Sequence, residues 1–487
     1  MEDREDMEKG SLGSGRGEGF GLMAGWMLLG LIFFALAVCG CGEKRVSWKR
    51  SGGMGAGAFW VWHRTSDLTD VERVRLEKAG VGRLCWQVAE GGWRDGAWRM
   101  VEIAPWRGGG VVPVFRLKPE PGFLGVEGSA EALAARILEW KGRFKGEGGE
   151  LAEVQLDFDC PERLLGEYAR WVRRLGEGLG GTRVSVTALA GWVRAAEFDE
   201  LCAEVCEMAP MFYDLTADAP EEAVAGRFVP MAGGEAEGWV REWGRCGVKW
   251  RAGLPNFERV TVFAADGRLR GHVRGWTRDE VFFHDGLEAV SSRDGVTVYR
   301  VRRAGGLCGT RLEEGGWVVH RMPERGALRR LVKAADEAGA ESVIWFALEG
   351  PGLVAAYDAV ALERGDVEPE LVVARRGDGS VVVRNVGEVD LPSRAVDGED
   401  VGDLEKRGWV IELRADGAGA FRSGSAGGFA WVGTEGGVPG EFAETMRLHV
   451  SSLRAGEEVR SGPILSSSGD VNFRVDGLGL EGVVISE

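Results

Sequence analysis

The feature that most constrains the fold is an alternation of short apolar runs with helical patterns over residues 58–348. The apolar runs have the β-branched and aromatic composition of strands, and amphipathic helical patterns separate most of them. Strands separated by helices pair in parallel through right-handed crossovers. The predicted strands cover residues 58–63, 83–88, 110–117, 153–159, 183–189, 208–215, 248–254 and 342–348. Eight such steps predict an α/β fold, a (β/α)₈ or TIM-like barrel over residues 58–350.

The fourth predicted strand has one polar face and one apolar face. Its polar side chains are Glu153, Gln155, Asp157 and Asp159, and they alternate with Val154, Leu156 and Phe158. A barrel strand is covered by helices on its outside, so the polar row is expected to face the barrel interior. Pro161 ends the strand and suits the first turn of the helix that follows. The two aspartates therefore come at the end of a strand, where barrel enzymes carry catalytic groups.

Asp157 and Asp159 are the predicted catalytic pair. Residues at i and i+2 of a strand point into the same cavity, so one carboxyl should hold a proton near neutral pH because of its neighbour's charge. The alternative is structural. In it, Asp159 caps the helix that begins near Pro161, and Asp157 belongs to a hydrogen-bond network inside the barrel.

Six further residues are candidates for the same site. Tyr213 and Asp214 end the sixth strand and are predicted catalytic residues, although a Tyr-Asp pair there can also satisfy neighbouring backbone groups. Trp192 and Trp345 could stack on a sugar ring or could belong to the core. Glu90, at the end of the second strand, and Gln155 are predicted to contact the substrate.

The rest of the chain from residue 260 onward follows a different pattern. Residues 260–326 alternate polar and apolar residues between glycine turns, which predicts β hairpins inserted near the barrel mouth. After a linker at 351–368, residues 369–487 contain short strand-like runs and no helical pattern. This region is predicted to form a small all-β sandwich domain.

The N-terminal segment predicts export. Residues 20–38 form an apolar run, and Cys41 follows in a sequence similar to a bacterial lipobox. We therefore expect residues 1–41 to be a signal peptide or lipoprotein leader, with lipid attached at Cys41, and residues 42–57 to be a linker. The protein would then be membrane-anchored outside the cytoplasm. The acidic residues before the apolar run leave an uncleaved membrane anchor as the alternative.

Composition limits the partners. A net charge of -16 without a basic stripe argues against nucleic acid. The cysteines beyond the leader lack the paired spacing of a zinc site, and the five histidines belong to no ligand motif. We therefore predict no metal and no cofactor.

Four segments resemble a bacterial family known as domain of unknown function 3142. They are Phe59-Trp-Val-Trp-His-Arg64, Val154-Gln-Leu-Asp-Phe-Asp-Cys-Pro161, Ser185-Val-Thr-Ala-Leu-Ala-Gly-Trp192 and Met208-Ala-Pro-Met211. The resemblance covers about residues 58–350. It implies a bacterial, extracytoplasmic protein and assigns no activity.

The chain also resembles family-18 glycoside hydrolases, TIM barrels that hydrolyse polymers of N-acetylglucosamine. The similar places are Gln155-x-Asp157-x-Asp159, Met211-Phe-Tyr-Asp214 and Trp345. The chain departs from that family at its general-acid glutamate, which aligns with Asp159 or with Pro161. The resemblance implies a glycan-active hydrolase, and the departure leaves a non-catalytic glycan-binding or structural envelope lipoprotein as the alternative.

Overall fold

The structure is a computed structural model. It describes residues 54–105, 110–143, 151–350, 352–353, 355–365, 367–392, 408–415, 420–423, 426–434, 442–467, 473–478 and 484–486. The predicted leader with Cys41 and most of the predicted linker at 42–57 lie outside these residues. Within the described residues, no helix has both the length and the apolar composition needed to cross a membrane.

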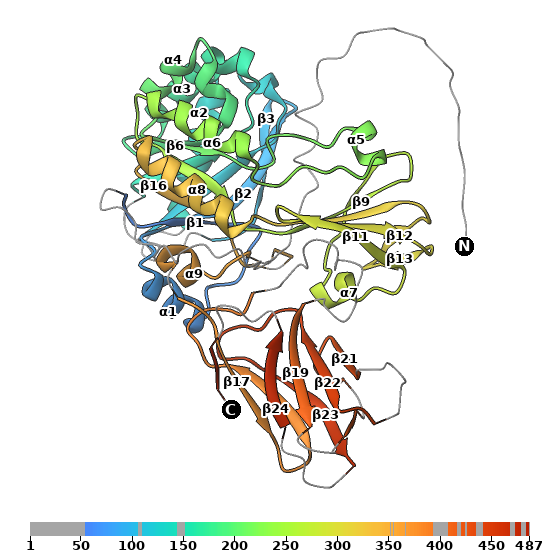
Figure 1. Ribbon diagram of the computed structural model, residues 1–487. Helices are drawn as coiled ribbons and strands as arrows, with labels where there is room; N and C mark the ends of the chain where they lie inside the picture. Colours follow the sequence, from blue (N-terminus) through green and yellow to red (C-terminus); the bar gives the residue numbers. More distant parts are fainter. Residues whose placement is uncertain are drawn as a thin grey trace, which may run out of the picture.

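A closed parallel barrel forms the first part of the described chain (Figure 1). Within the described residues its eight strands run in the spatial order β1, β16, β8, β7, β6, β5, β4, β2, and β2 pairs back with β1. The strands are β1 (Ala58–Val61), β2 (Arg83–Arg94), β4 (Val111–Leu117), β5 (Glu153–Asp157), β6 (Arg183–Leu189), β7 (Glu207–Met211), β8 (Arg251–Pro255) and β16 (Ser342–Leu348). The predicted TIM-like fold is confirmed.

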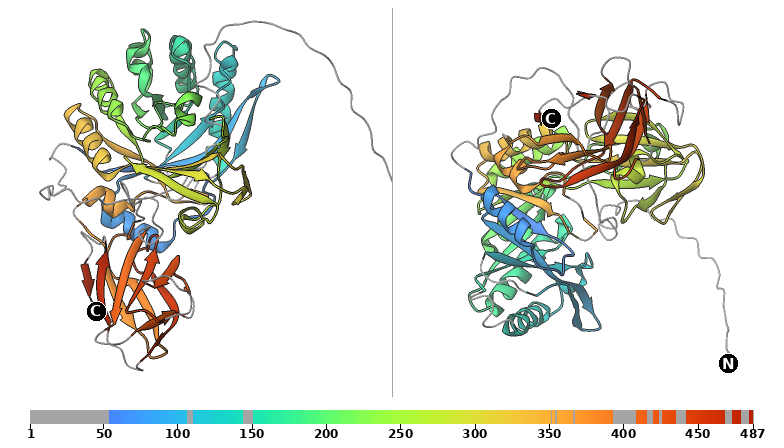
Figure 2. Two further views of the ribbon diagram at one scale, coloured as in Figure 1. Left: turned by 45° about the vertical axis from the view of Figure 1, so that its right-hand side comes forward. Right: turned by 90° about the horizontal axis from the view of Figure 1, so that it is seen from below.

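Helices cover the outside of the barrel, as Figure 2 shows. They are α1 (Asp70–Ala79), α2 (Ser129–Arg143), α3 (Leu165–Gly178), α4 (Phe198–Glu204), α6 (Gly234–Glu242), α8 (Arg325–Glu337) and α9 (Ala359–Arg364). The short helix α5 (Pro220–Val224) packs instead on the sheet inserted after β8, where Ala223 shares a core with Phe263 and Val298. The second step departs from the helical pattern, because β2 continues into a hairpin with β3 (Ala97–Glu102). Asp95 and Gly96 both have positive φ, which is the geometry of a two-residue hairpin turn.

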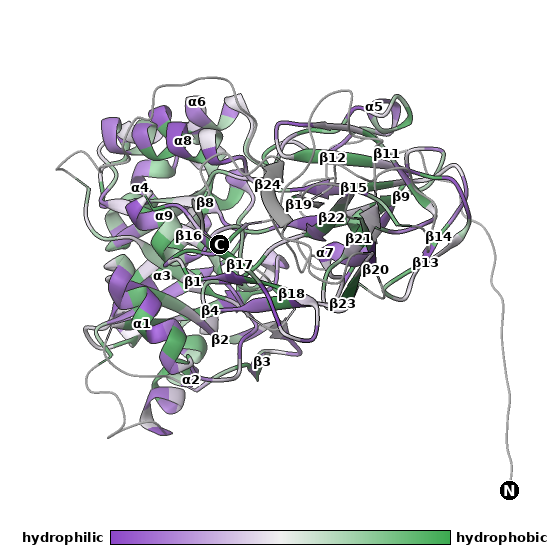
Figure 3. Cartoon of the chain, turned by 60° about the horizontal axis from the view of Figure 1, so that its bottom comes forward, coloured by the Kyte–Doolittle hydropathy of each residue, from purple (hydrophilic) through white to green (hydrophobic). Residues whose placement is uncertain are grey.

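Two apolar layers stabilise the barrel. The larger lies between the strands and the helices, and it includes Val154, Leu156 and Phe158 of the β5 segment. The smaller fills the barrel interior and includes Trp60, Val114 and Ile344. In Figure 3 the outer helices α1 and α2 carry both hydrophilic and hydrophobic residues, as expected for helices with one buried face.

Charged side chains close the floor of the barrel. Arg83 Nη2 lies 2.5 Å from Glu153 Oε1 and 3.2 Å from Glu207 Oε1. Arg251 Nε lies 2.9 Å from Glu207 Oε2. Both glutamates are buried, so the arginines supply the charge partners that buried carboxylates need.

An antiparallel sheet is inserted after β8, where that strand reaches the barrel mouth. In this fully described stretch five strands run in the spatial order β10, β9, β15, β12, β11, with β13 and β14 as a separate pair. The elements are β9 (Arg259–Phe263), β10 (Leu269–His272), α7 (Arg278–Phe282), β11 (Leu287–Arg293), β12 (Val296–Val301), β13 (Gly305–Leu307), β14 (Thr310–Leu312) and β15 (Trp317–Arg321).

The C-terminal region is a β sandwich. Among its described residues, one sheet has the order β20, β23, β18, β17, β25 and the other β21, β22, β19, β24. The strands are β17 (Glu370–Arg375), β18 (Ser380–Asn385), β19 (Trp409–Ala415), β20 (Phe421–Ser423), β21 (Trp431–Thr434), β22 (Thr445–Val450), β23 (Glu458–Ser466), β24 (Phe473–Leu478) and β25 (Val484–Ser486). A shared core with Val383, Ile411 and Leu448 lies between the sheets, so the predicted sandwich is confirmed.

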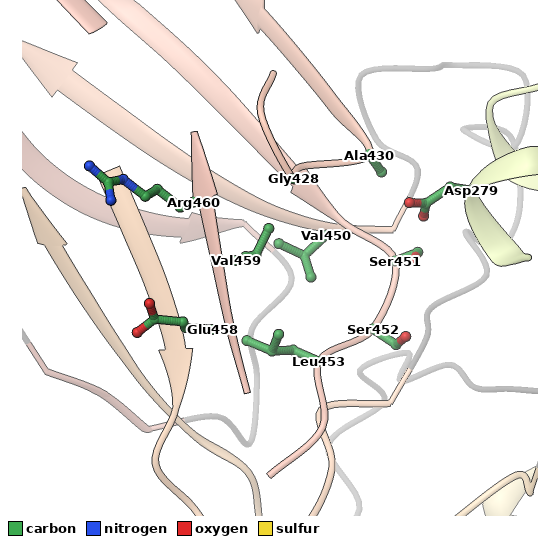
Figure 4. Close-up of a pocket in the computed structure, with 10 residues that line it drawn as sticks. All are labelled: Asp279, Gly428, Ala430, Val450, Ser451, Ser452, Leu453, Glu458, Val459 and Arg460. Carbon is green, nitrogen blue, oxygen red and sulfur yellow. The ribbon is translucent and has the colours of Figure 1, made fainter. Parts of the chain in front are cut away.

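The insertion also contacts the sandwich. Arg278 of α7 donates a hydrogen bond to Ser452 Oγ, and its Nε lies 3.5 Å from the buried carboxylate of Glu258. Beside this contact lies a pocket of about 440 Å³, into which Asp279 projects from α7 (Figure 4). The remaining lining comes from residues 428–460 of the sandwich. The predicted site residues do not line this pocket.

The barrel interior gives the first testable prediction. A methyl group at Gly253 would lie 2.7 Å from the Pro210 carbonyl oxygen and 3.0 Å from the Trp60 ring. We therefore expect Gly253→Ala to lower the free energy of unfolding by about 1–3 kcal/mol. The control is Gly176→Ala in α3, where no atom lies within 4 Å and alanine should stabilise the helix by roughly 0.5–1 kcal/mol. Denaturant unfolding measures the free energy of unfolding of both variants. Equal changes in the two variants would contradict the tight packing at Gly253.

Candidate functional site

The polar row of β5 faces the barrel interior, as its alternation predicts. Gln155 Oε1 accepts a hydrogen bond of 2.7 Å from Trp60 Nε1 inside the barrel. Its amide nitrogen is buried and has no hydrogen-bond partner. Gln155 therefore lies deep in the interior, below the carboxyl ends of the strands.

Asp157 ends β5 and is held by its neighbours on both sides. Arg116 of β4 donates from Nη1 to Asp157 Oδ2 at 2.7 Å. Thr187 of β6 donates from Oγ1 to Asp157 Oδ1 at 2.8 Å. The residue is 5% exposed. Each carboxylate oxygen therefore accepts a hydrogen bond, and the one from Arg116 is charge-assisted.

Asp159 lies just beyond the strand and is held much less firmly. Its Oδ2 is 4.0 Å from Arg116 Nη2, and its Oδ1 is buried with no hydrogen-bond partner. Burial, followed by the charge of Asp157, raises the pKa of Asp159 to about 7, although Arg116 acts in the opposite direction. The two carboxyls thus share one cation but differ in their hydrogen-bond partners.

The helix-capping alternative for Asp159 is not seen. The 3₁₀ helix η2 (Glu162–Leu164) and α3 both begin without a side-chain cap. The network alternative for Asp157 agrees with its two hydrogen bonds, and such a network is also how a catalytic carboxylate is held in place.

Tyr213 follows β7 and faces the same end of the barrel. Its ring stacks on Phe346 with centroids 5.7 Å apart and meets Phe257 edge-on at 5.5 Å. Burial raises the pKa of Tyr213 well above its usual value, and the charges of Asp157, Asp214 and Asp159 add to this effect. The phenol therefore stays protonated and can donate a hydrogen bond.

Asp214 is engaged by the inserted sheet. Its backbone has a φ of 51°, and its N–H donates to the Met231 carbonyl oxygen at 3.1 Å. Its carboxylate accepts two hydrogen bonds from the guanidinium of Arg259 in β9. Asp214 thus joins the barrel to the insertion, and its oxygens are already occupied by Arg259.

Glu90 lies at the same mouth. Gln87 Nε2 donates to Glu90 Oε2 at 3.2 Å, while Gln87 Oε1 accepts from the backbone N–H of His63 at 3.0 Å. Burial lowers the pKa of His63, which the charge of Glu90 opposes. Glu90 and His63 therefore form one rim of the site.

Trp192 and Trp345 do not face the mouth. Both are at most 1% exposed and lie in the layer between the strands and the helices. Trp192 Nε1 donates to the Cys160 carbonyl oxygen at 3.0 Å, and Trp345 Nε1 donates to Glu363 Oε1 at 2.8 Å. The alternation of β16 explains the second case, because its neighbour Ile344 faces inward. The expected stacking platform for a sugar is therefore corrected to a core role for both rings.

The structure adds residues that the sequence reasoning missed. Trp62 lies in the barrel interior, with the Arg116 guanidinium 5.6 Å from its ring centroid. Arg116 itself occupies the inward row of β4, two residues after Val114. That spacing could have identified Arg116 from the strand pattern alone. Thr187 carries the same kind of signal, because it alternates with the outward-facing Val186 and Ala188. Arg259 had no comparable signal.

Solvent can reach the acidic pair. The side chains of Arg116 and Asp159 are 21% and 13% exposed, while that of Asp157 is 6% exposed. Within the described residues, no cluster of three or more His, Cys, Asp or Glu side chains could hold a metal ion. The partial exposure of Asp159 suits proton transfer between this acid and a bound molecule.

Residues 110–275 match a family model described as Domain of unknown function, DUF3142. The search of curated protein sequences found no match. Among solved structures, the chain is similar to the spore cortex-lytic enzyme SleL from Bacillus megaterium, with 11% identity and a TM-score of 0.44. That alignment covers 65% of this chain and 75% of SleL.

Two other structures show the same range of similarity. One is a family-18 N-acetylglucosaminidase from Paenibacillus barengoltzii, with 13% identity, a TM-score of 0.39, and coverage of 60% of this chain and 95% of the other. The other is a chitinase-like agglutinin from Robinia pseudoacacia, with 9% identity, a TM-score of 0.37, and coverage of 60% and 94%. The barrel assignment rests on the strand pairing described above.

The pKa of Asp159 makes stability depend on pH. Its pKa rises from 3.8 to about 7 on folding, so the folded state binds more protons between these values. Stability of the wild type should therefore fall as pH rises through this window.

Asp159→Asn removes the titrating group, so its stability should not show this fall. The difference in unfolding free energy between the variant and the wild type should therefore shift in favour of the variant as the pH rises from 5 to 8. Thermal unfolding at both values measures the difference. A difference that does not change with pH, or that changes in the opposite direction, would contradict the raised pKa.

Proposed function

We propose that this protein is a glycan-active hydrolase in which Asp159 is the general acid. The observation that carries the proposal is the asymmetry of the carboxyl pair. Both oxygens of Asp157 accept hydrogen bonds, whereas Asp159 has a buried oxygen without a partner. An enzyme that cleaves a glycosidic bond needs one carboxyl that holds a proton and one that stays charged.

Each residue has a role in this mechanism. Asp159, near the mouth, protonates the leaving glycosidic oxygen. Asp157, fixed by Arg116 and Thr187, stabilises the positive charge that develops at the sugar. Tyr213, protonated and buried, donates a hydrogen bond to the reacting group.

The choice of a glycan is supported by motif similarity. Gln155-x-Asp157-x-Asp159 and Met211-Phe-Tyr-Asp214 resemble the acidic row and the Met-x-Tyr-Asp of family-18 glycoside hydrolases. The structure has these segments at the same end of one barrel, on β5 and at the end of β7. Gln155 and Glu90 are proposed to shape the binding of the substrate, from within the barrel and from its rim.

The test is a comparison of turnover and binding on soluble oligomers of N-acetylglucosamine. Asp159→Asn should reduce kcat by about 10²–10⁴-fold, because the amide keeps the shape and cannot supply the proton. Binding, measured by calorimetry, should be nearly unchanged. The matched control is Asp266→Asn, whose side chain is 63% exposed on a turn of the insertion and which should retain full activity.

Two other outcomes would contradict the hydrolase proposal. If the wild type binds a glycan and releases no product over days, the non-catalytic glycan-binding or structural role replaces the hydrolase. If Asp159→Asn fails to fold, the acidic pair is structural.

We also propose that the protein is exported and anchored to the membrane at Cys41. The proposal rests on the apolar run at residues 20–38 and the lipobox-like sequence at its end. It would place the barrel in the cell envelope, where glycan polymers are accessible to it.

Cys41→Ser tests this location in a bacterial host. The wild type should enter the detergent phase with the membranes, and the variant should lose that partition because the lipid cannot be attached. Mass spectrometry of the wild type should show a lipid-modified N-terminal cysteine. An intact, unmodified N-terminus would contradict the proposal.

A further inference from the structure

Two thiols lie together on neighbouring connections of the barrel. Cys202 belongs to α4, which connects β6 to β7. Cys246 follows the 3₁₀ helix η4 (Trp243–Arg245) on the connection from β7 to β8. Their Sγ atoms are 3.9 Å apart, although the residues are 44 positions apart in the sequence. Both thiols are free in the structure.

The surroundings make the two sulfurs unequal. The hydrogen bond from Cys202 lowers the pKa of Cys246, and the backbone N–H of Val248 lowers it further. The same contact raises the pKa of Cys202. Cys246 is also the more exposed of the two. Cys246 is therefore the thiol that ionises first and the one that reacts first with a small oxidant.

We propose that Cys202 and Cys246 form a reversible disulfide that links α4 to the connection preceding β8. From a separation of 3.9 Å, the sulfur atoms need to approach each other by about 2 Å to reach the length of a disulfide bond. The oxidant is a small disulfide such as oxidised glutathione. This inference does not depend on the proposed hydrolase activity.

The exchange balances in two steps. The Cys246 thiolate attacks one sulfur of the small disulfide, which breaks that S–S bond and releases one thiolate. Cys202 then loses its proton to solvent and attacks Cys246 Sγ of the mixed disulfide, which releases the second thiolate. The protein loses two electrons and two protons, and the small disulfide is reduced to two thiols.

The disulfide would close a ring that contains part of the candidate site. The intervening chain includes β7, α5 and α6, and also Tyr213 and Asp214 at the barrel mouth. Closing a ring of this length restricts the unfolded chain and should raise the thermal midpoint by several degrees.

Peptide mapping tests the proposal directly. The folded protein is incubated with oxidised glutathione, free thiols are blocked with N-ethylmaleimide, and the chain is digested with trypsin without reduction. Cleavage after Arg194, Arg227, Arg245 and Lys249 should give peptides 195–227 and 246–249 joined by a disulfide. The joined mass should be lower by two hydrogen atoms than the sum of the peptides, and a reductant should separate them.

Cys206 supplies the control because it lies on the same tryptic peptide as Cys202. Burial raises the pKa of Cys206 to about 12. Cys206→Ser should therefore keep the cross-link and its thermal shift, while Cys202→Ser and Cys246→Ser should lose both. Absence of the cross-link in wild type, a mixed disulfide with glutathione alone, or a cross-link that survives in Cys202→Ser would each overturn the proposal.

Discussion

Closure of the sheet is the constraint on which the rest of the structure depends. β1 pairs with β16 on one side and with β2 on the other, so the eight described barrel strands enclose a face that no helix covers. Polar groups on that face must find partners within the barrel or lose the hydrogen bonds that water would give them. At the floor, Arg83 forms ion pairs with Glu153 and Glu207, although Arg83 Nε and Glu207 Oε1 have no hydrogen-bond partner.

The mouth meets the same requirement incompletely. Arg116 lies 2.7 Å from Asp157 but 4.0 Å from Asp159, so one cation serves two acids unequally. Thr187 completes the environment of Asp157 alone. This inequality leaves Asp159 with a raised pKa beside a fully hydrogen-bonded Asp157, and acid catalysis requires a carboxyl that can hold a proton.

The inserted sheet makes the mouth different from that of a simple barrel. Arg259 from the insertion neutralises Asp214, and Phe257, just before it, packs edge-on against Tyr213. Tyr213 and Asp214 are thus held by the segment that follows β8. These contacts couple the stability of the insertion to the geometry of the site. Substitutions in the insertion should therefore change the positions of the Tyr213 and Asp214 side chains.

The sequence by itself determined the barrel and the inward direction of Asp157, because strand periodicity and the order of strands and helices are local properties. Arg116 was within reach of the same reasoning, since it shares an inward row with Val114. The hairpin after β2 carried its own signal in Asp95 and Gly96. Only the tertiary structure decided that Trp192 and Trp345 are core residues, that Arg259 occupies Asp214, and that Cys202 lies beside Cys246. These outcomes depend on which distant segments of the chain come into contact when the barrel closes. The periodicity of the sequence does not specify those contacts.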